Sequence, residues 1–140
     1  MGKAIIEVSG IDTFLKHINT IASHDQLRKA VKVSIINVHA TAKHLCAVDT
    51  GDLRNRMHMS ISEEGSTIVG RVSNDSDHAM FVEFGTGIRG EASNYPRADK
   101  LGLAYRPDWK GQVAQPFLYP ALKQNEDFVK ATIGAAAKGE

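Results

Sequence analysis

The sequence has a single cysteine, no excess of charge of either sign and no long apolar run, and each absence limits what the protein can be. Cys46 has no second cysteine to pair with, so an internal disulfide is excluded and a reducing compartment is expected. The 17 basic and 16 acidic residues leave a formal charge of +1, which gives no overall attraction to nucleic acid or to membranes. No apolar run approaches the roughly 20 residues of a membrane span, and no secretion signal is expected at the N-terminus.

Hydrophobic residues make up 42% of the 140 positions, which is enough for one compact domain over residues 1–140. The order of the patterns described below predicts an α+β fold. In this fold a small antiparallel sheet packs against a long central helix and a C-terminal helix, and a long loop lies at about residues 85–113.

The first 45 residues predict one strand and two helices. Lys3 to Val8 alternate and are rich in β-branched residues, which predicts a strand at the edge of the sheet. From Asp12 onward apolar residues recur at helical spacing, so a helix is predicted there. Ser23 and Gln26 resemble a capping box that begins the long helix. The stripe of the long helix that faces the core is predicted to consist of Leu27, Val31, Ile35, Val38, Ala42 and Leu45.

The long helix carries a second apolar stripe, formed by Val33, Ile36 and Ala40. A basic ridge separates it from the stripe that faces the core. A helix that only covers a sheet does not need a second stripe, so we predict that these three residues contact another subunit. The basic ridge consists of Arg28, Lys32, His39 and Lys43.

After the long helix, alternation over residues 57–63 and 67–73, with Gly65 between them, predicts a β-hairpin. Residues 78–84 are compatible with a strand or a helix, and a short helix is favoured. The weakly periodic loop that follows is long enough to have a function of its own. Pro116 ends any strand before it, and Pro120 lies in the first turn of the last helix. The core face of that helix is predicted to consist of Leu122, Asn125, Val129, Ile133 and Ala136.

Motifs for catalysis or metal binding occur only in isolation. The tripeptide Asp49-Thr50-Gly51 occurs once, whereas an aspartic protease needs two such carboxylates, so a capped turn explains it better. Cys46 has His44 close by in the sequence, but no oxyanion donors or orienting group can be named, so it is interpreted as a small buried apolar thiol. The six histidines show no metal-binding spacing. We therefore predict no enzymatic activity, no metal and no cofactor.

Glu83 is the most unusual carboxylate because large apolar residues flank it on both sides. Burial makes a charge costly unless it is paired, so an ion pair with Arg54 or Arg56, or a capping role, is favoured over acid-base catalysis. The neighbouring Gly85 and Gly87 lack the Gly-Lys-Ser/Thr ending of a phosphate-binding loop and predict a turn with positive φ.

The loop also combines basic and aromatic residues, a pattern found in nucleic-acid-binding surfaces. A contact between subunits explains the same residues, and the balance of charge favours it over sequence-specific DNA binding. The candidate interface therefore comprises Val33, Ile36, Ala40, Arg89, Tyr95, Tyr105 and Trp109.

Residues 48–54, 78–87 and 115–122, in this order, resemble the neck proteins of long-tailed bacteriophages, which are head-to-tail joining or tail-completion proteins. The resemblance implies a structural virion protein at the head-tail junction, made in the host cytoplasm and assembled as a sixfold or twelvefold ring. Genome DNA would pass through this ring without being read, and the implied partners are other copies and the connector, neck and tail proteins. A tail-tube terminator and a small DNA-associated protein remain as alternatives. A structural role is expected for Asp49, Thr50, Gly51, Glu83, Gly85, Gly87, Pro116 and Pro120.

Overall fold

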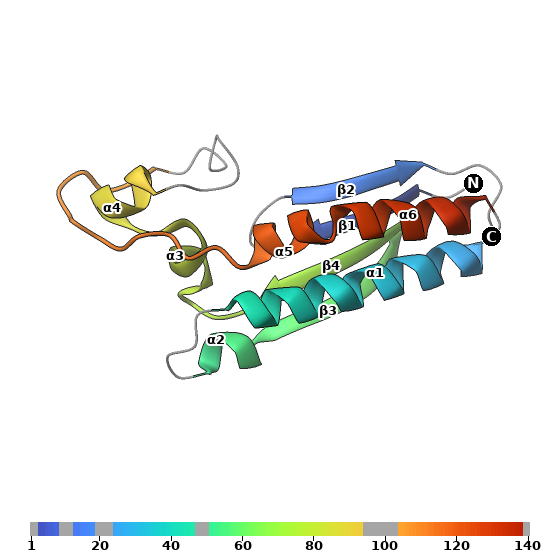
Figure 1. Ribbon diagram of the computed structural model, residues 1–140, viewed down its shortest axis with the longest axis horizontal. Coiled ribbons are helices and arrows are strands. Elements are labelled where there is room, and N and C mark those ends of the chain that lie inside the picture. The colour runs from blue at the N-terminus through green and yellow to red at the C-terminus, as the bar shows by residue number, and fades with distance from the viewer. Residues whose placement is uncertain (1–2, 9–12, 19–23, 47–50, 94–103, 139–140) are drawn as a thin grey trace.

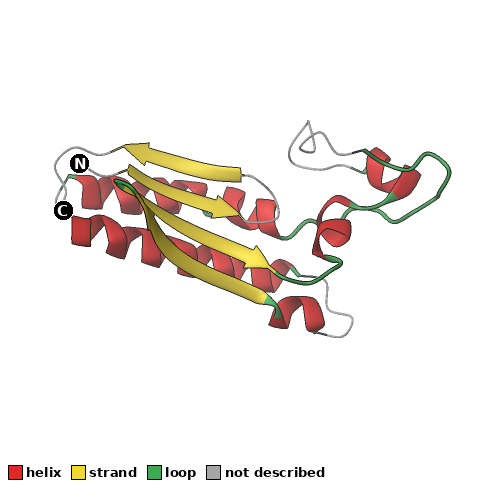
Figure 2. Cartoon of the chain, turned by 180° about the vertical axis from the view of Figure 1, so that it is seen from behind, coloured by secondary structure: helices red, strands yellow, loops and turns green. Residues whose placement is uncertain are grey.

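Helices cover one face of a four-stranded sheet (Figures 1 and 2). The computed structural model describes residues 3–8, 13–18, 24–46, 51–93 and 104–138. In Figure 1 the helices α1 (His24–Leu45) and α6 (Glu126–Ala137) lie in front of the strands, and in Figure 2 the strands lie in front. The predicted α+β class and the two covering helices are confirmed.

The sheet contains β1 (Lys3–Val8), β2 (Thr13–Ile18), β3 (Met57–Glu64) and β4 (Thr67–Asn74) in the order β2-β1-β4-β3. The pairs β1-β2 and β3-β4 are antiparallel, as expected, but β1 and β4 are parallel. The sheet is therefore mixed. The reason is the path of the chain. The helix α1 runs from the end of β2 back to the opposite end of the sheet, so β3 begins at the same end as β2. Because β1 is antiparallel to β2 and β4 is antiparallel to β3, the neighbours β1 and β4 are parallel.

Two predictions for the N-terminal segment are wrong. The residues after Asp12 form the strand β2 and not a helix, because their backbone pairs with β1 from Lys3↔Ile18 to Val8↔Thr13. This pairing places β1 inside the sheet, so β1 is not an edge strand. The proposed capping residue Ser23 lies outside the described residues, and α1 begins at His24.

The core forms between α1 and the sheet. The predicted stripe of α1 is buried from Leu27 to Ala42, and Leu45 packs against it. Gly70 on β4 lets the helix approach closely, because a Cβ atom there would lie 2.5 Å from Ile35 Cγ2. The sheet contributes Met57, Ile68 and Val72 to this core.

The C-terminal segment forms two helices where one was predicted, α5 (Leu118–Gln124) and α6. They meet at Asn125, whose Nδ2 donates to Ala121 O at 2.7 Å and to Thr41 Oγ1 of α1 at 2.9 Å. This side chain thus ties the junction to the long helix. Of the predicted core face, Leu122, Val129, Ile133 and Ala136 are buried, whereas Asn125 is only partly buried.

The hairpin β3-β4 and the short helix α3 (Ala79–Phe84) are confirmed. A four-residue helix, α2 (Asp52–Asn55), precedes the hairpin. The predicted loop contains another helix, α4 (Gly87–Ala92), and so is not wholly irregular. We call residues 85–93 and 104–114 the arm, because in both views they extend beyond one end of the sheet and its helices (Figures 1 and 2).

Candidate functional site

Glu83 is buried, with 1% of its surface exposed, and it holds the start of α5. Its Oε1 accepts hydrogen bonds of 2.8 Å from the backbone N–H groups of Phe117 and Leu118, and Oε2 accepts one of 3.2 Å from Tyr119 N–H. Amides at the start of a helix have no partner within the helix and favour a negative charge. The carboxylate therefore caps α5 and links α3, at the base of the arm, to the helical layer.

The arginines expected beside Glu83 make other contacts. Arg54 Nε donates to Lys43 O at 3.1 Å, and Arg56 pairs with Asp52 at 3.1 Å and with Asp75 at 3.6 Å. The structure shows the capping role that was one of the two predicted for Glu83.

Backbone hydrogen bonds join the two limbs of the arm. Thr86 and Gln112 exchange a pair of 2.9 and 3.0 Å, and Ile88 N–H donates to Trp109 O at 2.9 Å. Gly87 and Gly111 make this close crossing possible: both have positive φ, and a Cβ atom on either would overlap the backbone of the opposite limb. The sequence predicted this segment as a loop. Its conformation is stabilised by these hydrogen bonds between the two limbs and not by a local helix-forming sequence.

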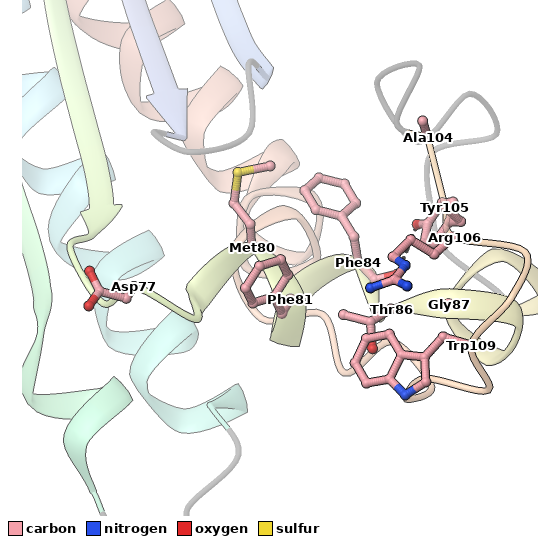
Figure 3. A pocket seen from close by; sticks show the side chains of 11 residues that line it. Asp77, Met80, Phe81, Phe84, Thr86, Gly87, Ala104, Tyr105, Arg106 and Trp109 are labelled. Carbon is pink, nitrogen blue, oxygen red and sulfur yellow. Dashed lines mark hydrogen bonds between the residues drawn. The ribbon is translucent and has the colours of Figure 1, made fainter.

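A pocket of about 340 Å³ lies between α3 and the arm (Figure 3). We call it the arm pocket. Phe81 and Trp109 contribute to its wall and are 58% and 51% exposed, so the pocket offers apolar surface to a partner. Tyr105 also lines it and is fixed in place, because its hydroxyl donates to Phe84 O at 2.9 Å. The charged side chains in the lining are Asp77 and Arg106.

A second hollow, of about 300 Å³, lies on the body between α1 and β3. We call it the body groove. Ile36 and Met59 line it and are 41% and 45% exposed, and Val33 on the same helix is 46% exposed. Ala40 is exposed as well. The predicted second stripe of α1 is therefore on the surface. The charged residues that line the body groove are Arg28 and Lys32.

The structure divides the predicted interface residues between these two surfaces. Tyr105 and Trp109 come together in the arm pocket, and Arg89 lies exposed on α4, with its N–H donating to Lys110 O. The residues of the second stripe of α1, by contrast, are on the body. Tyr95, Asp49 and Thr50 lie outside the described residues.

The glycines and prolines expected to have structural roles occupy turns and helix starts. Gly51 precedes α2 with φ of 78°, and Gly85 follows α3 with φ of 75°. Pro116 precedes α5, and Pro120 is the third residue of that helix. The positive φ predicted for Gly85 and Gly87 is confirmed.

Met59, Met80 and Phe81 are exposed apolar residues that the sequence patterns did not single out. Met80 and Phe81 lie in the apolar run around Glu83, within which the sequence interpretation did not separate buried from exposed positions. The helical spacing of α3 could have shown the division, because Ala79 and Glu83 face inward while Met80 and Phe81 face out.

Cys46 is buried, and this burial raises the pKa of its thiol to about 11, with a contribution from Glu83 that Arg54 and Lys43 oppose. Within the described ranges, no group of three histidine, cysteine, aspartate or glutamate side chains could hold a metal ion. None of the helices described is both long enough and apolar enough to cross a membrane.

Residues 11–85 match the model of the protein family described as "Bacteriophage HK97-gp10, putative tail-component". The match includes α1 with its second stripe, the hairpin and Glu83, and it ends at Gly85, where the arm begins. Comparisons with curated proteins and with solved structures found no match.

Proposed function

The chain belongs to the HK97-gp10-like family of bacteriophage tail components, and from this premise we propose that it acts at the junction of head and tail. In this proposal it completes the tail and joins it to the filled head. Copies form a ring at the neck of the virion and contact connector, neck and tail proteins. Genome DNA passes through the ring without sequence-specific contacts.

The observation that carries the ring proposal is the presence of two different exposed apolar surfaces on one chain. The arm pocket and the body groove share no lining residue, since the first lies between α3 and the arm and the second between α1 and β3. A contact between two different surfaces repeats from copy to copy and gives a ring when the rotation closes. Isolated exposed apolar residues are ordinary, but two hollowed surfaces with several such residues each are typical of interaction sites.

We further propose that the protein has no catalytic activity. The carboxylate of Glu83 is already engaged by three backbone amides, which leaves it poorly placed to exchange protons with a substrate. The raised pKa of the Cys46 thiol keeps that group protonated and weakly nucleophilic near neutral pH. A role in assembly needs neither group to react.

The proposal is tested by labelling the protein in virions and by deleting its gene, with electron microscopy as the measurement. We expect label at the neck and, after deletion, filled heads beside separate tails of normal length. Tails of uncontrolled length would instead indicate a tail-tube terminator. Label at the far end of the tail, or joined particles without the protein, would contradict a role at the junction.

A further inference from the structure

We infer that copies of this chain contact one another through two different surfaces. The second stripe of α1 from one copy enters the arm pocket of the next copy. Val33 and Ile36 supply the apolar side chains, and Lys32 faces Asp77. The inference deepens the ring assembly proposed above and rests on it, because it names the two surfaces that meet.

The apolar parts of the two surfaces suit each other. The arm pocket is walled by aromatic and aliphatic side chains, among them Phe81 and Trp109, that stay exposed in the single chain. The stripe presents exposed, branched aliphatic side chains at the regular spacing of a helix. Aliphatic side chains of a helix that fill an aromatic pocket are typical of the anchor contacts that dominate binding energy.

One copy cannot make this contact with itself. The arm extends beyond one end of the body in both views (Figures 1 and 2), whereas Val33 and Ile36 lie near the middle of α1, which runs along the body. The second stripe and the arm pocket of one chain therefore remain apart, and a contact between these two surfaces takes two chains.

The charges on the two surfaces are complementary. In the body groove Arg28 already pairs with Glu63 at 3.0 Å, which leaves Lys32 without an ion pair among the described residues. In the arm pocket Arg106 pairs with Asp108 at 2.9 Å, and Asp77 has no ion pair within the described part of the chain. Each surface thus has one charged side chain without an ion pair among the described residues, Lys32 on the first and Asp77 on the second, and their charges are opposite. Such complementarity fixes the register of a contact and disfavours wrong partners.

Cross-linking tests whether the two surfaces meet. A chain with both Lys32→Cys and Asp77→Cys is treated with a short bis-maleimide in lysates of phage-producing cells and detected by blotting. We expect a ladder of multiples of the chain mass, because each copy links to the next. Either cysteine alone is the matched control. It can link at most two copies and should give no dimer, since position 32 meets position 77 and not its own equivalent. The native Cys46 is buried and should not contribute.

Charge exchange tests the pairing of Lys32 with Asp77. Lys32→Asp and Asp77→Lys should each reduce joined particles by about tenfold or more, because each places like charges together. Produced in the same cell, the two variants should restore assembly: the introduced aspartate meets the introduced lysine at one contact, and the native pair meets at the next. Such rings alternate, which an even number of copies permits.

The outcomes separate this inference from the proposed function. Label at the neck without a ladder, with dimers from either single cysteine, or with cross-links only to another protein would overturn the contact between stripe and pocket and leave the neck role intact. Failure of the two charge variants to restore each other would also overturn it. A ladder from a protein absent from the neck would support the contact and reject the role at the junction.

Discussion

Glu83 and Phe117 are 34 positions apart, and the carboxylate of the first accepts a 2.8 Å hydrogen bond from the backbone N–H of the second. Both residues are buried. The bond connects α3, from which the arm extends, to the start of α5 in the helical layer. The position of the arm therefore depends on a capping contact that forms only when distant segments have folded together.

We expect Glu83→Gln to lower the free energy of unfolding by about 2 kcal/mol, because hydrogen bonds to a charged acceptor are lost and an amide group meets backbone donors. Glu83→Ala should cost more, since three amides lose their acceptor. Urea unfolding followed by circular dichroism measures both. Glu64→Gln is the control, because its ion pair with Arg71 is exposed and should contribute little. A midpoint for Glu83→Gln equal to that of the native chain would show that the cap does not stabilise the fold.

The elements that the sequence predicted correctly are those with a local signal. The core stripe of α1 repeats over more than five turns, and the β3-β4 hairpin combines alternation with a glycine turn. In contrast, the spacing of apolar residues after Asp12 predicted a helix, whereas Thr13–Ile18 form the strand β2. Their ladder with β1 decides between the two, and ladder pairing is not visible in a short window of sequence.

Less of the site could be predicted, because most of its contacts join segments that are distant in the sequence. A carboxylate within an apolar run indicated that Glu83 is buried, but its partners are backbone amides of a later segment, which have no sequence signature. The helix α4 contains two glycines, which disfavour a helix, and it is held by bonds to Trp109 and Lys110. The exposed stripe of α1 was predicted because it follows from helical spacing alone.

We expect Gly111→Ala to open the base of the arm. Gly111 has φ of 68°, and a Cβ atom there would overlap Thr86 O on the opposite limb. Gly65→Ala is a matched control, because Gly65 has a similar φ of 64° but open space around it. The control should lose only about 1 kcal/mol from backbone strain.

Hydrogen exchange at Thr86 and Gln112 measures the effect, because these amides bond across the crossing. They should exchange faster in Gly111→Ala and at the native rate in Gly65→Ala. Equal protection in all three proteins would mean that the crossing tolerates a side chain and does not depend on glycine.

The thiol of Cys46 should resist alkylation in the folded protein. With a pKa of about 11, about one thiol in a thousand is ionised at pH 8, and burial restricts access further. We expect slow labelling by iodoacetamide in buffer and rapid labelling in urea, measured by mass spectrometry.

The raised pKa of Cys46 also predicts how the free energy of unfolding changes with pH. The folded state holds the thiol proton more tightly than the unfolded state, so this contribution is present below about pH 9 and is lost as pH rises toward 11. The stability of Cys46→Ala should therefore fall less steeply over this range than that of the native chain. Identical slopes would show that the thiol titrates normally.

Ile36→Asp should leave the chain folded and block the joining of heads to tails. Ile36 is 41% exposed on α1, so the charge stays in water in the free chain, and circular dichroism and urea unfolding should change little. At a contact between copies the same charge would be buried against apolar side chains without a partner, which is costly. Electron microscopy should then show filled heads and finished tails that remain separate.

Phe128→Asp is the matched control for Ile36→Asp. Phe128 is also 41% exposed and also lies on a helix, but it lines neither the body groove nor the arm pocket. We expect joined particles with this variant. If both substitutions blocked joining, the effect would reflect a general sensitivity to surface charge. Joined virions that carry Ile36→Asp at the neck would show that the stripe is not the contact, because a buried, unpaired carboxylate there could not be tolerated.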